Sequence, residues 1–126
     1  MGVPSVTASS SSCTFHSYQA SLNATPVLLF QGRGNLYGFL VEDNSGDDIF
    51  VQVFDAASAG DVTVGTTVPA FTFRVKAEQA FGKDVNDSPY KFFSKGCVVA
   101  VTTLRGNAIS PAVAATGQFW FVNRQP

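Results

Sequence analysis

The stretch NLYGFLVEDNSGDDIFVQVFD (residues 35–55) decides the fold. It holds two apolar runs, 36–41 and 49–54, on either side of the polar insert EDNSGDD. Gly, Asn and Asp tolerate the positive φ angles and local hydrogen bonds of a tight reversal, so the pattern predicts a β-hairpin. Neither run has a cleanly polar face. Both strands are therefore expected in the middle of the fold, covered on both sides.

The composition predicts one domain, because 126 residues are enough for a single hydrophobic core. Hydrophobic residues make up 45% of the chain and charged residues only 13%, about half of the usual share. Together with twelve Phe residues, this scarcity of charge indicates that another subunit covers part of the apolar surface. The net charge of −1 gives no electrostatic reason to expect nucleic-acid binding. No apolar run is long enough to cross a bilayer, so no membrane partner is expected.

The first twelve residues, MGVPSVTASSSS, are small and mostly polar and cannot bury much apolar surface. They predict a flexible N-terminal arm (1–12), without the basic and apolar regions of a secretory signal, ahead of one domain (13–126). Two interpretations stay open for this arm. It is either a tail without a role or a segment that docks on a partner.

The two cysteines, Cys13 and Cys97, lie far apart in the sequence. One possibility is a disulfide between them; the favoured one is a pair of buried, reduced thiols in a protein that assembles in the cytosol. One histidine and two cysteines without ligand spacing do not make a tetrahedral zinc set, so neither a metal nor a cofactor is expected.

Short strands and turn signals follow one another along the chain. An edge strand is predicted at 13–18, a short buried strand at 27–30, and between 31 and 34 a turn whose two glycines adopt left-handed conformations. A loop of small residues crosses the fold at 56–69, and a second loop, at 77–89, is expected to hold one helical turn around 78–81. The other predicted strands are 70–76, 90–93, 97–104 and 118–123. Seven or eight short strands without a convincing helix predict an all-β fold, a β-sandwich or jelly roll.

Residues that would carry chemistry are scarce. His16 is the only histidine and has no nucleophile context around it, so we expect no enzyme. Glu42, Asp43, Asp47 and Asp48 lack the alternating spacing of a calcium loop and are better interpreted as a solvated turn. Exposed aromatic residues such as Tyr18, Tyr90 or Trp120 could stack on sugars, as in a lectin. Trp120 lies between two Phe residues, which favours a place in the core or a subunit interface.

Four motifs appear in a fixed order: LYGFLVEDN (36–44), VFDAASA (53–59), VGTTVPAF (64–71) and FSKGCVVAVT (93–102). In this order they resemble small β-rich structural proteins encoded beside the capsid or tail genes of tailed bacteriophages. The resemblance covers about 31–123. Two segments depart from it, the long polar insert at 78–89 and the Ser-rich N-terminal arm, and both are candidates for contacts particular to one virion.

The resemblance implies a non-enzymatic virion component with a jelly-roll-like sandwich, assembled in the host cytoplasm. Its implied role is that of a capsid decoration (cement) protein, which sits on the shell as a symmetric oligomer, often a trimer, and bridges neighbouring capsomers. Its expected partners are the major capsid protein or other virion proteins. Two alternatives stay open: a tail, baseplate or fibre component, and a carbohydrate-binding module on the virion surface, which would need a groove with exposed aromatic residues beside carboxylates or amides.

The residues expected to touch a partner fall in four places. They are Pro4 and Val6 in the N-terminal arm; Asp43, Asp47 and Asp48 at the tip of the predicted hairpin; Phe81, Lys83 and Asp84 in the long polar insert at 78–89; and Arg74 and Lys76 on the solvated face of their strand. Exposed ion pairs contribute only about 0–1 kcal/mol each, so an aromatic anchor must supply most of any tight interface.

Overall fold

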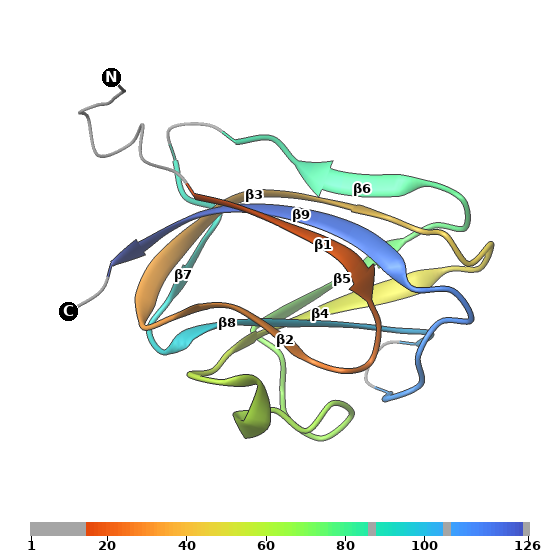
Figure 1. Cartoon of the computed structure of the whole chain (residues 1–126), viewed down its shortest axis with the longest axis horizontal. Coiled ribbons are helices and arrows are strands. Elements are labelled where there is room, and N and C mark those ends of the chain that lie inside the picture. The colour runs from red at the N-terminus through yellow and green to blue at the C-terminus, as the bar shows by residue number, and fades with distance from the viewer. Residues whose placement is uncertain (1–14, 86–87, 105–106, 125–126) are drawn as a thin grey trace.

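The computed structural model describes residues 15–85, 88–104 and 107–124, with the backbone alone at Arg124. The predicted N-terminal arm, with Pro4 and Val6, lies outside the described residues, as does Cys13. Within them the chain forms nine strands and one short 3-10 helix (Figure 1). In chain order these are β1 (Phe15–Leu22), β2 (Val27–Gln31), β3 (Arg33–Glu42), β4 (Ile49–Asp55), η2 (Ala59–Asp61), β5 (Phe71–Val75), β6 (Ala80–Lys83), β7 (Lys91–Phe93), β8 (Gly96–Thr102) and β9 (Ala115–Arg124).

The strands form two antiparallel sheets that face each other. The first has the order β1-β9-β3-β6, with β7 also paired to β3, and the second has the order β2-β8-β4-β5. Successive strands change sheet at every connection except β4–β5 and β6–β7. This is the strand order of a jelly roll, so the predicted all-β sandwich is confirmed. β6 and β7 pair with different parts of β3, β6 with Phe39–Glu42 and β7 with Gly34–Leu36.

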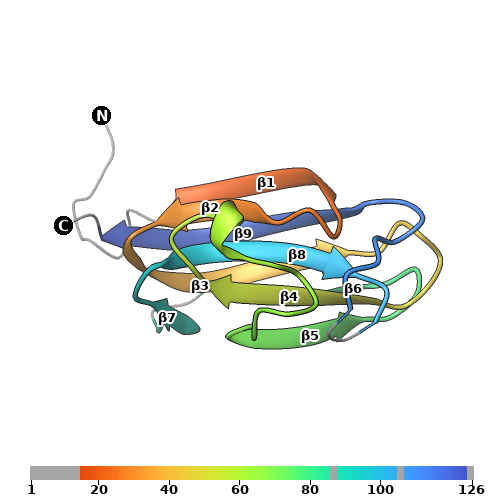
Figure 2. The ribbon, with the colours of Figure 1, turned by 90° about the horizontal axis from the view of Figure 1, so that it is seen from below.

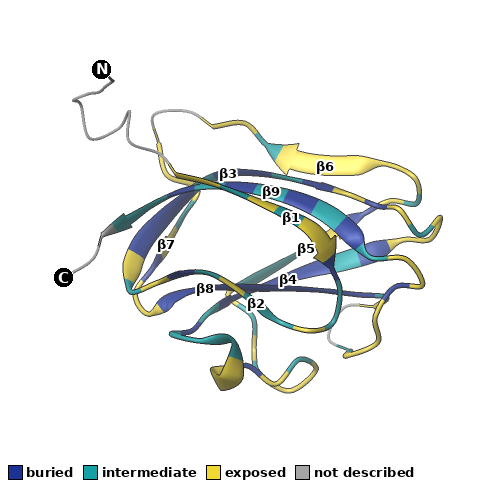
Figure 3. Cartoon of the chain, in the orientation of Figure 1, coloured by how far each residue is buried: buried dark blue, intermediate teal, exposed yellow. Residues whose placement is uncertain are grey.

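Side chains that alternate inward from both sheets form the core. On β5, for example, Phe71, Phe73 and Val75 contact the core and Arg74 is exposed, as the sequence predicted. A second apolar cluster lies on the other face of the second sheet and comprises Phe54, Ala56, Val62, Val98 and Ala100. Part of it comes from the segment around η2, which crosses this face (Figures 1 and 2). Burial is therefore deepest along β4 and β8 (Figure 3).

The predicted hairpin at residues 35–55 is wrong, because β3 and β4 belong to different sheets. The prediction that both are central strands is confirmed. β3 lies between β9 and the β6/β7 pair, and β4 lies between β8 and β5. The inward face of each run packs in the core between the sheets, and the outward face of β4 is covered by the segment around η2. Residues 43–48 of the polar insert therefore connect the two sheets, because Glu42 is the last residue of β3.

Smaller differences concern the turns and edges. The helical turn expected around 78–81 is replaced by β6, which pairs with the edge of β3 and satisfies its backbone hydrogen bonds. In the turn at 31–34 only Gly32 has a positive φ (86°), because Gly34 already belongs to β3. The strand expected at 27–30 is only partly buried, since β2 is an edge strand.

Candidate functional site

A group of aromatic rings fills the seam where β5 and β6 form neighbouring edges of the two sheets. This aromatic edge consists of Phe39, Phe71, Phe73, Phe81 and Tyr90. The ring centroids of Phe39 and Phe73 are 4.7 Å apart, and those of Phe73 and Phe81 are 5.3 Å apart. Phe39 is buried, whereas Phe81 and Tyr90 are 47% and 44% exposed. The aromatic edge thus extends from the core to the surface.

Three predicted contact residues meet beside the aromatic edge. Arg74, Lys76 and Phe81 line a pocket of about 380 Å³ that Phe73, Gln79 and Ala80 complete. Arg74 forms an ion pair with Asp48 at 3.7 Å, with both side chains about half exposed. Asp48 also accepts the backbone N–H of Ala77 at 2.9 Å. The surface here combines apolar rings with basic side chains.

Asp43 differs from its predicted place on an exposed turn, because it is only 8% exposed. Its carboxylate accepts hydrogen bonds from the backbone N–H groups of Ser45, Gly46 and Glu78 and from the Ser45 hydroxyl, at 2.6–3.1 Å. Burial alone would raise the pKa of Asp43, but these hydrogen bonds outweigh it and hold the pKa below 3.8. Asp43 is therefore a structural residue, whereas Asp47 and Asp48 are exposed as predicted.

Asp55 is a second structural carboxylate, which the sequence did not single out. It accepts the backbone N–H groups of Ser94, Lys95 and Gly96, and the Ser94 hydroxyl at 3.0 Å. Burial opposes ionisation here too, yet the hydrogen bonds hold the pKa of Asp55 below 3.8. Its position at the end of an apolar run was the available signal, since Asp often caps backbone N–H groups in turns.

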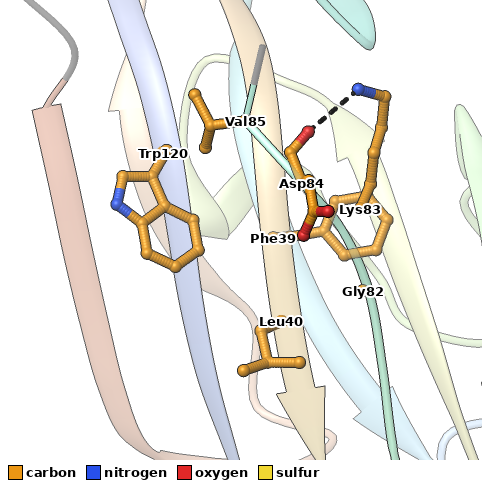
Figure 4. A pocket seen from close by; sticks show the side chains of 7 residues that line it. All are labelled: Phe39, Leu40, Gly82, Lys83, Asp84, Val85 and Trp120. Carbon is orange, nitrogen blue, oxygen red and sulfur yellow. Dashed lines mark hydrogen bonds between the residues drawn. The ribbon is translucent and has the colours of Figure 1, made fainter.

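The outer face of the first sheet carries a pocket of about 470 Å³. The residues that line this indole pocket are Phe39, Leu40, Gly82, Lys83, Asp84, Val85 and Trp120 (Figure 4). It brings the predicted contact residues Lys83 and Asp84 together with Trp120, which the sequence placed in the core or an interface. Trp120 is partly buried and stacks on His16, with ring centroids 4.9 Å apart. The Nε2 atom of His16 lies 3.0 Å from the Oε1 atom of Gln118.

Metal-ligating and thiol groups are dispersed in the described residues. These residues contain no group of three or more His, Cys, Asp or Glu side chains that could hold a metal ion. Cys97 is a buried free thiol, and burial raises its pKa. None of the described helices is long and apolar enough to span a membrane.

Comparisons of the chain with protein-family models, curated proteins and solved structures give no match.

Proposed function

We propose that this chain is a non-enzymatic structural protein of a bacteriophage virion and that it decorates the capsid. In this role it binds the major capsid protein, as a homotrimer, and bridges neighbouring capsomers. A protein that binds the assembled shell better than its free subunits stabilises the shell by mass action. The order of the four sequence motifs and the jelly-roll strand order both support the proposal.

The aromatic edge is the observation that carries this proposal. Interfaces derive most of their affinity from a few buried aromatic or Arg side chains, and a monomer gains little from leaving such rings in water. Phe81 and Tyr90 are half exposed at the end of a continuous row of rings. The basic groups of Arg74 and Lys76 lie at its border, where they can meet acidic groups of a partner.

The direct test mixes the purified protein with phage capsids stripped of their decoration proteins. Saturable binding at micromolar concentration is expected, together with greater resistance of the shell to heat. Replacement of Phe81 and Tyr90 by Ser should weaken binding at least tenfold, since it removes two aromatic anchors. The matched control is Phe15→Ser, because Phe15 is also exposed (56%) but lies on β1, at the opposite edge of the first sheet.

Two further measurements separate the related roles. Purified tails and baseplates, offered in place of capsids, distinguish a tail component from a decoration protein. Light scattering gives the mass of the free protein in solution, and a trimer supports the symmetric decoration unit. The absence of binding to capsids at micromolar concentration contradicts the decoration role, and saturable binding to tails alone replaces it.

A further inference from the structure

The indole pocket has a construction that the virion role does not require. At about 470 Å³ it falls within the range of small-molecule sites, about 300–1,000 Å³. One wall is the segment that follows β6 and crosses the outer face of β3. The absence of a side chain at Gly38 makes this crossing possible, since a Cβ there would lie 2.7 Å from the carbonyl oxygen of Lys83 and 2.7 Å from Val85.

The opposite wall is the indole ring of Trp120. In the sheet register Trp120 lies between His16 on β1 and Gly38 on β3. The imidazole of His16 covers the ring on the β1 side. On the β3 side the paired residue is glycine, so the space beside the ring is bounded by the Val85 side chain of the crossing segment and not by a side chain of β3. The apolar surface of the ring and the side chains of Leu40 and Val85 therefore line the pocket (Figure 4).

Hydrogen-bond acceptors and donors both lie at or next to the indole pocket. The carboxylate of Asp84 is exposed and lies across the pocket from Trp120 (Figure 4). The ammonium group of Lys83 donates to the backbone carbonyl oxygen of Asp84 at 3.2 Å. Gln118 pairs with Leu40 in the register, next to the pocket. Its Oε1 atom is engaged by His16, and its amide nitrogen has no partner among the described residues.

We propose that the indole pocket binds a neutral glycan. The C–H face of a pyranose ring packs on the indole ring, where apolar C–H groups leave water. Its hydroxyl groups donate to the Asp84 carboxylate and accept from Lys83 or from the Gln118 amide. The phenol of Tyr18, exposed and paired with Gln118 in the register, extends the same face for a second sugar unit.

The charges at the pocket favour this ligand over a basic side chain of a protein partner. A guanidinium group would also stack on an indole and pair with a carboxylate. Here, however, Lys83 lines the same pocket as Asp84, with its ammonium group on the backbone carbonyl of Asp84 and 5.7 Å from the centre of the Tyr90 ring. The pocket therefore carries one positive and one negative side chain and has no net negative charge to attract a cation. A neutral polyhydroxylated ligand uses the donor and the acceptor equally.

The experiment uses the fluorescence of Trp120, which is the only Trp in the sequence and therefore reports on this pocket alone. The full-length protein is titrated with cellotriose, maltotriose, mannotriose and triacetylchitotriose. We expect a saturable change in emission with at least one of them, with a dissociation constant in the millimolar range, as is usual for a single shallow sugar site. Asp84→Asn should weaken that binding about tenfold or more, because it removes a charged acceptor.

The control variant is Asp61→Asn, which changes an exposed carboxylate on η2, in the segment that crosses the opposite face of the sandwich. It should leave the titration unchanged, and circular dichroism should show the same fold for both variants. N-acetylargininamide is titrated in parallel. A saturable response to this cation without a response to the sugars overturns the proposal in favour of a protein partner, and no response to any probe overturns it as well. The capsid-binding test contains no sugar and depends on Phe81 and Tyr90, not on the indole pocket. Either proposal can therefore fail while the other stands.

Discussion

The carboxylate of Asp43 accepts a hydrogen bond from the backbone N–H of Glu78 at 2.8 Å, although 35 residues separate the two in the sequence. This bond joins the connection between β3 and β4 to the connection between β5 and β6. Glu78 has a positive φ of 61°, which a residue with a side chain rarely adopts. Asp43 therefore helps to hold a strained residue in the turn that leads into β6, the strand that carries Phe81.

Replacement of Asp43 by Ala should lower the free energy of unfolding by about 2–4 kcal/mol, because it removes a charged acceptor from several buried or partly buried donors. Urea denaturation followed by circular dichroism measures the loss. Asp47→Ala, which changes an exposed carboxylate in the same turn, should shift the stability by less than about 0.5 kcal/mol. Equal effects of the two substitutions would show that the Asp43 hydrogen bonds contribute little.

Stability should also fall in acid, because the folded protein holds the pKa values of Asp43 and Asp55 below 3.8. In the unfolded chain both carboxyl groups have ordinary pKa values and take up protons at a higher pH than in the folded protein. The stability that the two ionised carboxylates contribute is therefore fully present above the ordinary pKa of an unfolded Asp. It is lost as the pH falls through the lowered pKa values of Asp43 and Asp55 in the folded protein. Urea midpoints measured from pH 7 down to pH 3 test this dependence.

The Asp43→Asn and Asp55→Asn double variant serves as the comparison for the pH series. It should be less stable than the original chain at pH 7, and its stability should change less between pH 5 and pH 3 because the two titrating groups are gone. Parallel pH curves for the two proteins would assign the acid sensitivity to other carboxyl groups.

The close approach at Gly38 leads to a third prediction. Gly38→Ala places a Cβ against the backbone carbonyl of Lys83, so the segment that forms one wall of the indole pocket must move. We expect a loss of about 1–3 kcal/mol in stability, as for other overpacked sites, and a shifted emission maximum of Trp120. The control is Gly60→Ala in η2, where an added Cβ would find its nearest neighbour, the Ser58 hydroxyl, at 3.8 Å. Unchanged stability and emission for Gly38→Ala would mean that the crossing segment moves away without cost.

Local patterns predicted the strands well and their partners less well. The alternation on β5 and the two-sided apolar character of β3 and β4 follow from each strand's own residues, and the structure confirms both. Whether residues 43–48 close a hairpin or connect two sheets depends on whether β3 and β4 pair with each other or with other strands. For β3 the neighbours are β9, β6 and β7, whose sequences lie 38 residues or more downstream of Glu42. The turn residues of 43–48 alone could not indicate these partners.

For the candidate sites, the sequence predicted individual exposed residues but not which of them lie together. Arg74, Lys76 and Phe81 were expected to be exposed contact residues, and the structure brings them to one pocket because β5 and β6 are neighbouring edges. The indole pocket was not predicted, since its walls come from β3, β9 and the segment after β6. Two Phe neighbours suggested burial of Trp120, but strand alternation directs Phe119 and Phe121 inward and Trp120 outward.

The last prediction concerns Cys97, whose thiol is buried on the central strand β8. Burial raises its pKa, and Asp55 adds a repulsive negative charge, so the reactive thiolate is scarce in the folded protein. In a Cys13→Ser variant, Cys97 should therefore resist a thiol reagent under native conditions and react once the protein is unfolded in urea. Rapid labelling without denaturant would contradict this placement of the residue. Labelling of the original chain in urea without reductant tests whether Cys13 and Cys97 form a disulfide. Two reactive thiols are expected if both cysteines are reduced, and none if they are bonded to each other.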